Sequence, residues 1–196
     1  MAEQSYATVT YLRSYGDRSR DDDGIVGKVL DSMVELLRAM PYGTITTRSI
    51  AERAGVGHAE LCAYFRSKNA IVAEVYLELL RAAPLAIDVE QPVRARVTAQ
   101  FDQLMMLLAD EPQIAAACSS ALICDEVSVR AIRQRIHEEL HRRVRAALRS
   151  GAWPEVAETL EFGLIGALVH ASCAGTFRET AEDLANVVTA LLPDGH

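Results

Sequence analysis

Residues 44–68 constrain the fold of this chain more than any other segment, because they combine two short amphipathic patterns with a glycine between them. Thr46 and Thr47 are short polar residues that suit the start of a helix. Gly55 stands where a chain leaving a helix often takes a left-handed conformation. Apolar residues recur at helical spacing on both sides of that glycine: Ile50, Ala51, Ala54, Val56, Leu61 and Phe65. Two short helices joined at a glycine are typical of a helix-turn-helix, whose second helix enters the major groove of DNA.

The same segment resembles the N-terminal DNA-binding domain of the tetracycline-repressor (TetR) family of transcriptional regulators. Apolar, glycine and polar positions all agree with the family pattern: Gly43, Thr46, Thr47, Arg48, Ile50, Ala51, Ala54, Gly55, Val56, Leu61, Tyr64, Phe65, Ser67 and Lys68. Beyond the helix that begins at Lys68, the chain resembles the family only in length and helical texture.

The resemblance and the chemistry of the side chains together predict which residues contact DNA. Arg48 can donate two hydrogen bonds to a guanine edge, and the resemblance implies that it reaches a base. Thr46 and Thr47 stand at a helix start, where hydroxyl and backbone N–H groups meet phosphate. Tyr64 and Lys68 match family positions that contact the DNA backbone. The second helix adds further candidates for the groove: Gly57, His58, Ala59, Glu60 and Ala63.

The second helix departs from the family pattern at three positions. Gly57, Glu60 and Cys62 stand where the family usually has serine, threonine and tyrosine. Gly57 can still begin a helix, whereas Cys62 lacks a phenolic donor to phosphate. Phosphates repel the carboxylate of Glu60, which can instead accept a hydrogen bond from a cytosine amine or pair with an arginine. We therefore expect the fold to be kept and the DNA contacts to be altered.

Composition favours helices but not a generally basic nucleic-acid binder. Half of the 196 residues are apolar, 6% are aromatic, and the formal net charge is −7. Within residues 44–68, however, four basic residues face two acidic ones: Arg48, Arg53, Arg66 and Lys68 against Glu52 and Glu60. The four cysteines show no CxxC spacing and no targeting peptide is visible, so we expect reduced thiols in a cytoplasmic protein. The longest uncharged runs are shorter than the ~20 apolar residues of a membrane span, so no membrane contact is expected.

Periodicity, prolines and glycines predict an all-α chain with an arm and two domains. Residues 1–23 lack helical periodicity and are expected to form a flexible arm, whose arginines can reach a phosphate or a minor groove. Residues 24–82 are expected to form a three-helix DNA-binding domain, and residues 83–196 a larger domain for effector binding and dimerisation. Outside the two helices of the helix-turn-helix, we expect helices at residues 24–40, 68–83, 93–109, 112–124, 125 or 128–150, 154–174 and 179–192.

Residues 137–141, HEELH, match the H-E-x-x-H pattern of zinc proteases. The helix that contains them has a buried stripe to one side of both histidines: Ile132, Ile136, Leu140 and Val144. Five arginines surround the motif and oppose a divalent cation. No third ligand follows at a typical spacing, although Glu158, Glu161 and His170 are present. We interpret the motif as the solvated face of an amphipathic helix and expect no metal and no cofactor.

The C-terminal domain has two expected tasks. The resemblance implies that the last two helices pair with their copies in a homodimer. Small residues in the first of these allow a close approach of helices: Gly163, Gly166, Ala167 and Ala171. Apolar and weakly polar residues can line a cavity for a small apolar effector: Phe101, Met105, Met106, Cys118, Leu122, Trp153, Phe162, His170 and Phe177.

We therefore expect a homodimeric, ligand-responsive transcriptional regulator, a repressor that binds a palindromic double-stranded DNA operator, and not an enzyme. One alternative is an effector-binding or partner-binding dimer whose DNA binding has weakened, as Glu60 and Cys62 allow. The other is a helical zinc hydrolase that uses His137, Glu138 and His141. The chemistry of the effector and the sequence of the operator do not follow from the residues.

Overall fold

The structure, a computed structural model, describes residues 21–149, 154–173 and 176–192. These residues form α-helices, one short 3-10 turn and no strand, which confirms the expected all-α class. The elements are α2 (Asp21–Ala39), η2 (Tyr42–Thr44), α3 (Thr47–Ala54), α4 (His58–Tyr64), α5 (Lys68–Ala82), α6 (Val93–Met106), α7 (Pro112–Ile123), α8 (Val127–Leu148), α9 (Pro154–Cys173) and α10 (Phe177–Leu191). Most of the predicted arm and Trp153 lie outside the described residues.

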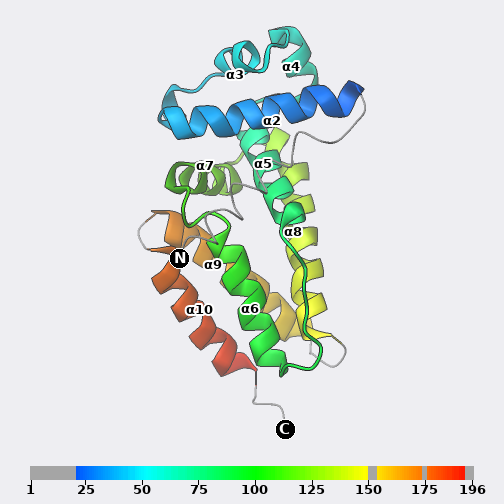
Figure 1. Cartoon of the computed structure of the whole chain (residues 1–196), viewed down its shortest axis with the longest axis vertical. Helices are drawn as coiled ribbons and strands as arrows, with labels where there is room; N and C mark the ends of the chain where they lie inside the picture. Colours follow the sequence, from blue (N-terminus) through cyan, green and yellow to red (C-terminus); the bar gives the residue numbers. More distant parts are fainter. Residues whose placement is uncertain (1–20, 150–153, 174–175, 193–196) are drawn as a thin grey trace.

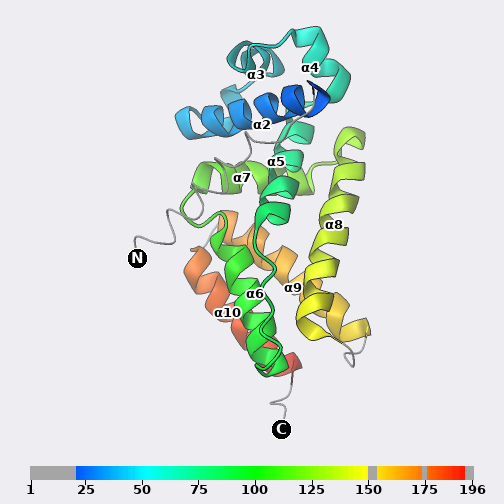
Figure 2. The same ribbon diagram turned by 45° about the vertical axis from the view of Figure 1, so that its right-hand side comes forward.

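The helices divide into a small group at one end of an elongated molecule and a larger group at the other (Figures 1 and 2). Helices α2, α3 and α4 form the small group, which we call the N-terminal unit. Helices α6 to α10 form the larger group, the C-terminal unit. Helix α5 joins them, because it packs against α2 on one side and against α7 and α8 on the other. Helix α5 ends at Ala82, and the division of the chain into domains at this residue stays a prediction.

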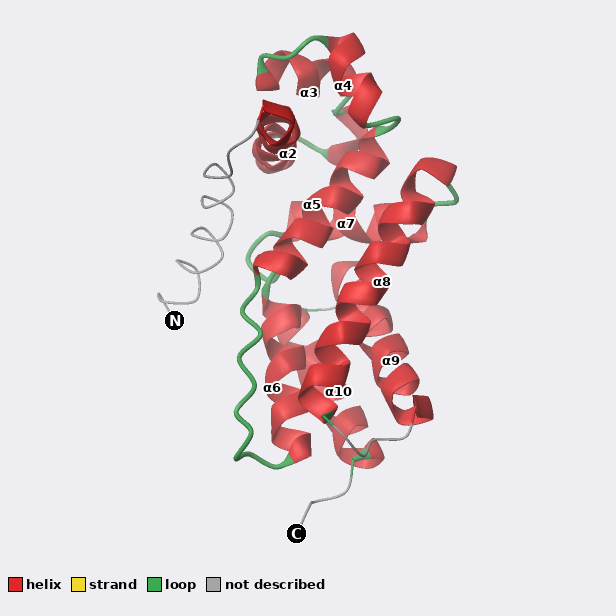
Figure 3. Ribbon diagram, turned by 90° about the vertical axis from the view of Figure 1, so that its right-hand side faces the viewer, coloured by secondary structure: helices red, strands yellow, loops and turns green. Residues whose placement is uncertain are grey.

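The N-terminal unit holds together around apolar side chains from each of its helices. Met33 and Leu37 of α2 are fully buried, and so are Ile50 of α3 and Leu61 of α4. Each such side chain contributes about 1.5–3 kcal/mol when it is removed from water. Helices α3 and α4 lie on the side of α2 away from the C-terminal unit (Figure 3).

Several helix boundaries differ from the sequence prediction. Helix α2 begins at Asp21, inside the predicted arm. Helix α6 ends at Met106, because the backbone tightens there and Leu107 N donates to Leu104 O at 3.4 Å. Helix α10 begins at Phe177 and not at residue 179, because the Thr176 side chain caps it by accepting from Glu179 N. Sequence periodicity alone does not locate such caps.

Arg143 joins α8 to the end of α5. Its side chain is 1% exposed. The guanidinium donates to Glu139 Oε1 at 2.7 Å and to Ala83 O at 2.8 Å, and it also donates to the carbonyl oxygen of Leu80. The last carbonyl groups of α5 have no partner within their own helix. Arg143 supplies those partners, so that α5 and α8 are tied together where α5 ends.

We expect Arg143→Met to lower the free energy of unfolding by about 3 kcal/mol, because it leaves buried carbonyl groups without donors. The matched control is Arg142→Met, which removes an exposed arginine from the same Glu139 carboxylate and should cost less than about 1 kcal/mol. Urea unfolding monitored by circular dichroism measures both. Equal losses in the two variants would contradict the assigned role of Arg143.

A cluster of polar side chains connects the start of α5 to the turn between α7 and α8. Ser67 Oγ lies 3.0 Å from Ser128 Oγ. Asn69 donates to Glu126 Oε1, and Ser128 Oγ donates to Glu126 Oε2 at 3.2 Å. The hydrogen bond from Ser67 lowers the pKa of the Glu126 carboxyl; partial burial opposes this shift, and the bonds from Asn69 and Ser128 add to it. The ionised carboxylate is therefore the form that this contact stabilises.

Because the folded-state pKa of Glu126 lies below its unfolded value, its contribution to stability is full above the unfolded pKa and declines as pH falls through the folded one. We expect Glu126→Gln to be less stable than the parent chain at neutral pH and to converge with it in acid. The control is Asp125→Asn, since the neighbouring carboxylate is 97% exposed. Thermal unfolding across a pH series measures the effect, and a stability difference that does not depend on pH would refute it.

Candidate DNA-binding site

Helix α3 begins and ends as its residue types dictate. The hydroxyl of Thr46 accepts from Ser49 N at 3.1 Å, and Ser49 Oγ accepts from Thr46 N at 3.0 Å. This reciprocal pair satisfies N–H groups that a helix start leaves without partners. At the other end, Gly55 has φ 66° and ψ 31°, the left-handed conformation that the sequence predicted. Thr46 and Gly55 therefore set both ends of the first helix of the helix-turn-helix.

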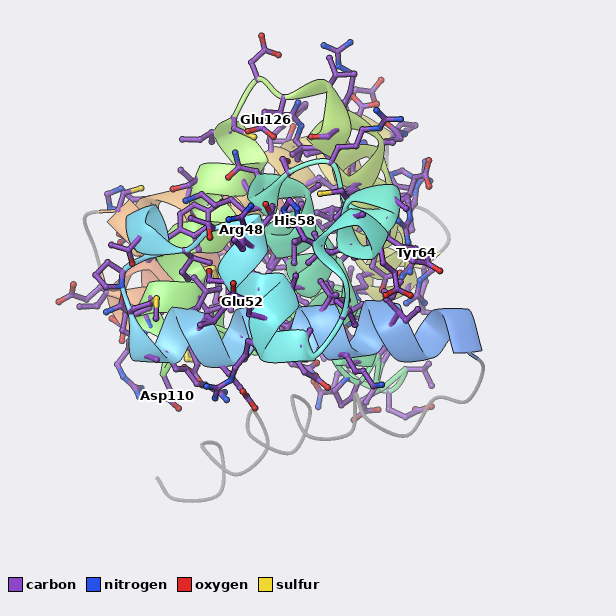
Figure 4. The ribbon with its side chains drawn as sticks, turned by 90° about the horizontal axis from the view of Figure 1, so that it is seen from above. Arg48, Glu52, His58, Tyr64, Asp110 and Glu126 are labelled. Atoms are coloured by element: carbon purple, nitrogen blue, oxygen red, sulfur yellow. The ribbon has the colours of Figure 1, made fainter. Side chains whose placement is uncertain are left out.

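The polar surfaces of α3 and α4 lie together at the end of the molecule, and Figure 4 views them from above. Most of the predicted contact residues are exposed there: Thr46, Arg48, Gly57, His58, Ala59, Glu60, Ala63 and Tyr64. Thr47 and Lys68 are half-buried. The fold thus places residues 46–48 and 57–64, which are separated by several residues in the sequence, on one surface. Whether these residues touch DNA stays a prediction.

The Glu60 carboxylate has a partner within the chain that was not expected from the sequence. Its Oε2 atom accepts from Gly57 N at 3.3 Å, one turn earlier in the same chain. The carboxylate thus lies at the start of α4, where it satisfies an N–H group and opposes the positive end of the helix dipole. Glu60 replaces the cap that Gly57 lacks. This explains how a carboxylate is tolerated on the surface expected to face phosphates.

His58 lies against side chains from both helices. Its Nε2 atom is 3.0 Å from Thr47 Oγ1 of α3 and 3.6 Å from Cys62 Sγ of α4. The contact between Thr47 and His58 could not be predicted from the sequence pattern, because the two residues lie on different helices.

Lys68 is held within the N-terminal unit. Its Nζ atom donates to Tyr42 O at 2.9 Å and to Ile45 O at 3.1 Å, and it lies 4.3 Å from the centre of the Tyr42 ring. An ammonium group has three donors, so one is left for a phosphate. The interactions show a structural role that the sequence analysis did not predict, namely fixing the loop before α3.

Charge on this surface is uneven. Arg53 pairs with Glu35 of α2 at 2.8 Å, and both side chains stay exposed. Arg48 and Arg66 are exposed. Of the four basic residues in residues 44–68, Arg53 and Lys68 thus have partners within the protein. The other two are exposed, Arg48 near the start of α3 and Arg66 after the end of α4.

Comparisons with known proteins agree with this geometry. Residues 29–75 match the family model described as bacterial regulatory proteins, tetR family. The chain is 42% identical to an uncharacterized HTH-type transcriptional regulator of Mycobacterium tuberculosis, over 89% of this chain and 84% of the relative. The chain belongs to the TetR family.

Solved structures show the same fold. A TetR transcriptional regulator from Rhodococcus sp. RHA1 superposes with a TM-score of 0.76 at 15% identity, covering 88% of this chain and 98% of that one. BioQ bound to its double-stranded DNA operator superposes with a TM-score of 0.58 at 20% identity, covering 84% of this chain and 98% of that one. At these identities the likeness concerns the fold. With the family established, this TetR-family chain is a DNA-binding transcriptional regulator and not an enzyme.

The zinc-hydrolase alternative is therefore wrong, and the structure gives the two histidines another role. His141 Nδ1 lies 2.7 Å from Glu161 Oε1 of α9, and His137 Nδ1 lies 3.9 Å from Glu161 Oε2. Glu161 is 2% exposed. The histidines therefore lie beside a buried carboxylate and link α8 to α9. Among the described residues, no group of three metal-ligating side chains is placed to hold a metal ion.

The candidate effector residues of this TetR-family chain fall into two sets. Those on α6 and α7 lie in or against the core of the C-terminal unit: Phe101, Met105, Met106, Cys118 and Leu122. Phe177 is also buried, whereas Phe162 and His170 of α9 are exposed. The structure does not bring these last two side chains into the core of a single chain. Their contact with an effector stays a prediction.

Two buried polar residues were missed by the sequence analysis. Within the described part of the chain, Tyr76 OH of α5 and Gln100 Oε1 of α6 are buried without a hydrogen-bond partner. Each residue is 2% exposed. A buried polar atom without a partner is costly, and it often marks a place where a water or a ligand binds. Neither residue stands out in the sequence, because a tyrosine or glutamine on an apolar helix face is common.

Helix α9 is the one described helix that is long and apolar enough to cross a membrane by length and composition, although the sequence analysis expected none. One such helix is weak support for a membrane protein, since core helices of soluble proteins pass the same test. Here α9 packs against α7, α8 and α10. Only 33% of its most apolar window is buried within the chain, so part of its apolar surface is left uncovered.

Proposed function

We propose that this chain is a cytoplasmic repressor that binds a palindromic DNA operator as a homodimer and is released by a small effector. The single observation that carries the DNA-binding part is the common exposed surface formed by the start of α3 and by α4. Backbone and hydroxyl groups at the start of a helix suit phosphate, and Arg48 suits a guanine edge. BioQ, which shares this fold, was solved with its double-stranded DNA operator, and this supports DNA binding.

The observations on Glu60 favour this function over the alternative of a dimer with weakened DNA binding. Because Glu60 accepts a hydrogen bond from Gly57 N, its charge is partly compensated by the start of α4. Measuring affinity for DNA over a salt series separates the two, since displacement of counterions makes phosphate contacts strongly dependent on salt.

A homodimer through α9 and α10 accounts for their uncovered apolar surface. Phe162 of α9 is 69% exposed and Val187 of α10 is 42% exposed. Gly166 is exposed and has free space around its Cα atom, whereas Gly163 faces Leu184 of α10 within the same chain. A Cβ atom at Gly163 would make only an ordinary contact with Leu184, so packing inside the subunit does not require a glycine there, and Gly166 is the position that would allow a second copy to approach α9 closely. In a two-fold dimer, the two copies of α4 would lie about 34 Å apart, one turn of DNA.

We expect Phe162→Glu to convert the dimer into a monomer, because it puts a charge into an apolar interface. The matched control is Ile123→Glu, an apolar side chain that is 66% exposed at the end of α7, which should leave the dimer intact. Sedimentation velocity measures the molecular mass of both variants. A parent chain that sediments as a monomer, or a Phe162→Glu variant that stays dimeric, would refute the interface.

The effector site is proposed at the core of the C-terminal unit. Tyr76 OH of α5 can donate a hydrogen bond and Gln100 Oε1 of α6 can accept one, so each atom is a candidate anchor for an apolar ligand that carries a polar group. Release from DNA requires that the ligand bind one conformation of the dimer better than the DNA-bound one. Glu126 bonds to Asn69 at the start of α5 and to Ser128 at the start of α8. A shift of α7 and α8 would therefore reach the start of α5, beside the N-terminal unit.

We expect Arg48→Ala to weaken operator binding by about 1–3 kcal/mol and to relax the preference at one base pair, because a two-bond contact to a base is lost. Selecting bound fragments from genomic DNA first yields the operator, and fluorescence anisotropy then gives the affinities. Arg53→Ala is the control, since its guanidinium pairs with Glu35. If Arg48→Ala binds operator and scrambled DNA as the parent does, Arg48 does not contact a base.

A further inference from the structure

Thr47 belongs to α3, but its hydroxyl faces α4. The Oγ1 atom lies 3.0 Å from His58 Nε2, the first residue of α4. Thr47 is half-buried between the helices, whereas the His58 side chain is exposed. The contact bridges the two helices on the surface proposed to face DNA. Thr47 therefore directs its hydroxyl to a neighbouring side chain in the DNA-free protein.

This bond restricts what the imidazole can present to a ligand. A neutral histidine has one donor and one acceptor nitrogen, and the partner of one nitrogen determines the role of the other. Thr47 and the Cys62 thiol both lie at Nε2. The nitrogen that remains for a ligand is therefore Nδ1, on a ring held by two neighbours. In the major groove, a ring nitrogen can donate to guanine or adenine N7, or accept from an adenine or cytosine amine.

We propose that His58 is a specificity-determining residue that contacts a base edge, and that Thr47 is the positioning residue that holds its ring. This inference rests on the proposed DNA-binding function, and it replaces the phosphate contact that the sequence analysis predicted for Thr47. A hydroxyl that contacts phosphate strengthens binding to every DNA sequence, whereas a hydroxyl that positions His58 acts only through the base that His58 contacts.

A double-mutant cycle on the full-length protein tests the proposal. The variants are Thr47→Val, which keeps the shape and removes the hydroxyl, His58→Ala, and the two combined. Each is titrated against the selected operator, against a series of operators with single base-pair changes, and against scrambled DNA. Thr47→Ser restores the hydroxyl and serves as the rescue variant. Thermal unfolding confirms that each variant is folded.

We expect His58→Ala to lose about tenfold in discrimination at one base pair. Thr47→Val should lose discrimination at that same base pair, Thr47→Ser should keep it, and the double variant should lose no more than His58→Ala alone. Arg48→Ala provides a matched comparison, since its loss should fall at a different base pair and add to that of Thr47→Val.

Two results would overturn the positioning role. One is a Thr47→Val variant that binds every DNA sequence more weakly by the same factor, with or without His58, because that behaviour belongs to a phosphate contact. The other is a His58→Ala variant with unchanged discrimination. Failure of the proposed function is distinguishable, because a parent chain that binds operator and scrambled DNA equally would show it before any variant is made.

Discussion

The conformation of Gly55 is the constraint on which the DNA-facing surface depends. Its φ of 66° lies in the region that residues with a Cβ atom enter only with strain. Because the chain turns there, Gly55 N and Val56 N bond back to carbonyl groups at the end of α3, and only three residues separate α3 from α4. Ile50 and Leu61 are then both buried against α2. Without the turn at Gly55, the apolar faces of α3 and α4 would separate, and Arg48 and His58 would no longer share a surface.

The N-terminal unit is also tied to the rest of the molecule through polar contacts that span long stretches of chain. Lys68 bonds to the carbonyls of Tyr42 and Ile45, so the start of α5 fixes the loop that leads into α3. At the far end of α5, Arg143 satisfies the last carbonyls. Hydrogen bonds from the half-buried Lys68 at its start and from the buried Arg143 at its end thus fix α5 at both ends. Helix α5 therefore lies between the N-terminal unit and α8, with contacts to both.

Local rules predicted the parts of this fold that depend on neighbours in sequence. The capping by Thr46, the turn at Gly55 and the helices that begin at prolines follow from residue types within a few positions. Contacts between distant residues could not be predicted in that way. Arg143 appears in the sequence as one of several arginines around two histidines, yet the fold buries it against α5. Glu161 likewise meets His141 only because α8 and α9 pack together.

The candidate site shows the same difference between features that residue types predict and contacts that side-chain geometry decides. The pattern of residues predicted a helix-turn-helix, and the family comparison confirms it. The pattern did not reveal that Glu60 bonds to Gly57 or that Thr47 bonds to His58, because side-chain geometry decides both.

The central claim is that the surface formed by the start of α3 and by α4 binds DNA specifically. Hydrogen–deuterium exchange of the full-length protein, free and bound to the selected operator, tests it most directly. The account predicts that amides of residues 46–48 and 57–64 become protected with the operator and much less with scrambled DNA. Specific binding accompanied by protection elsewhere, with these two segments unchanged, would contradict it.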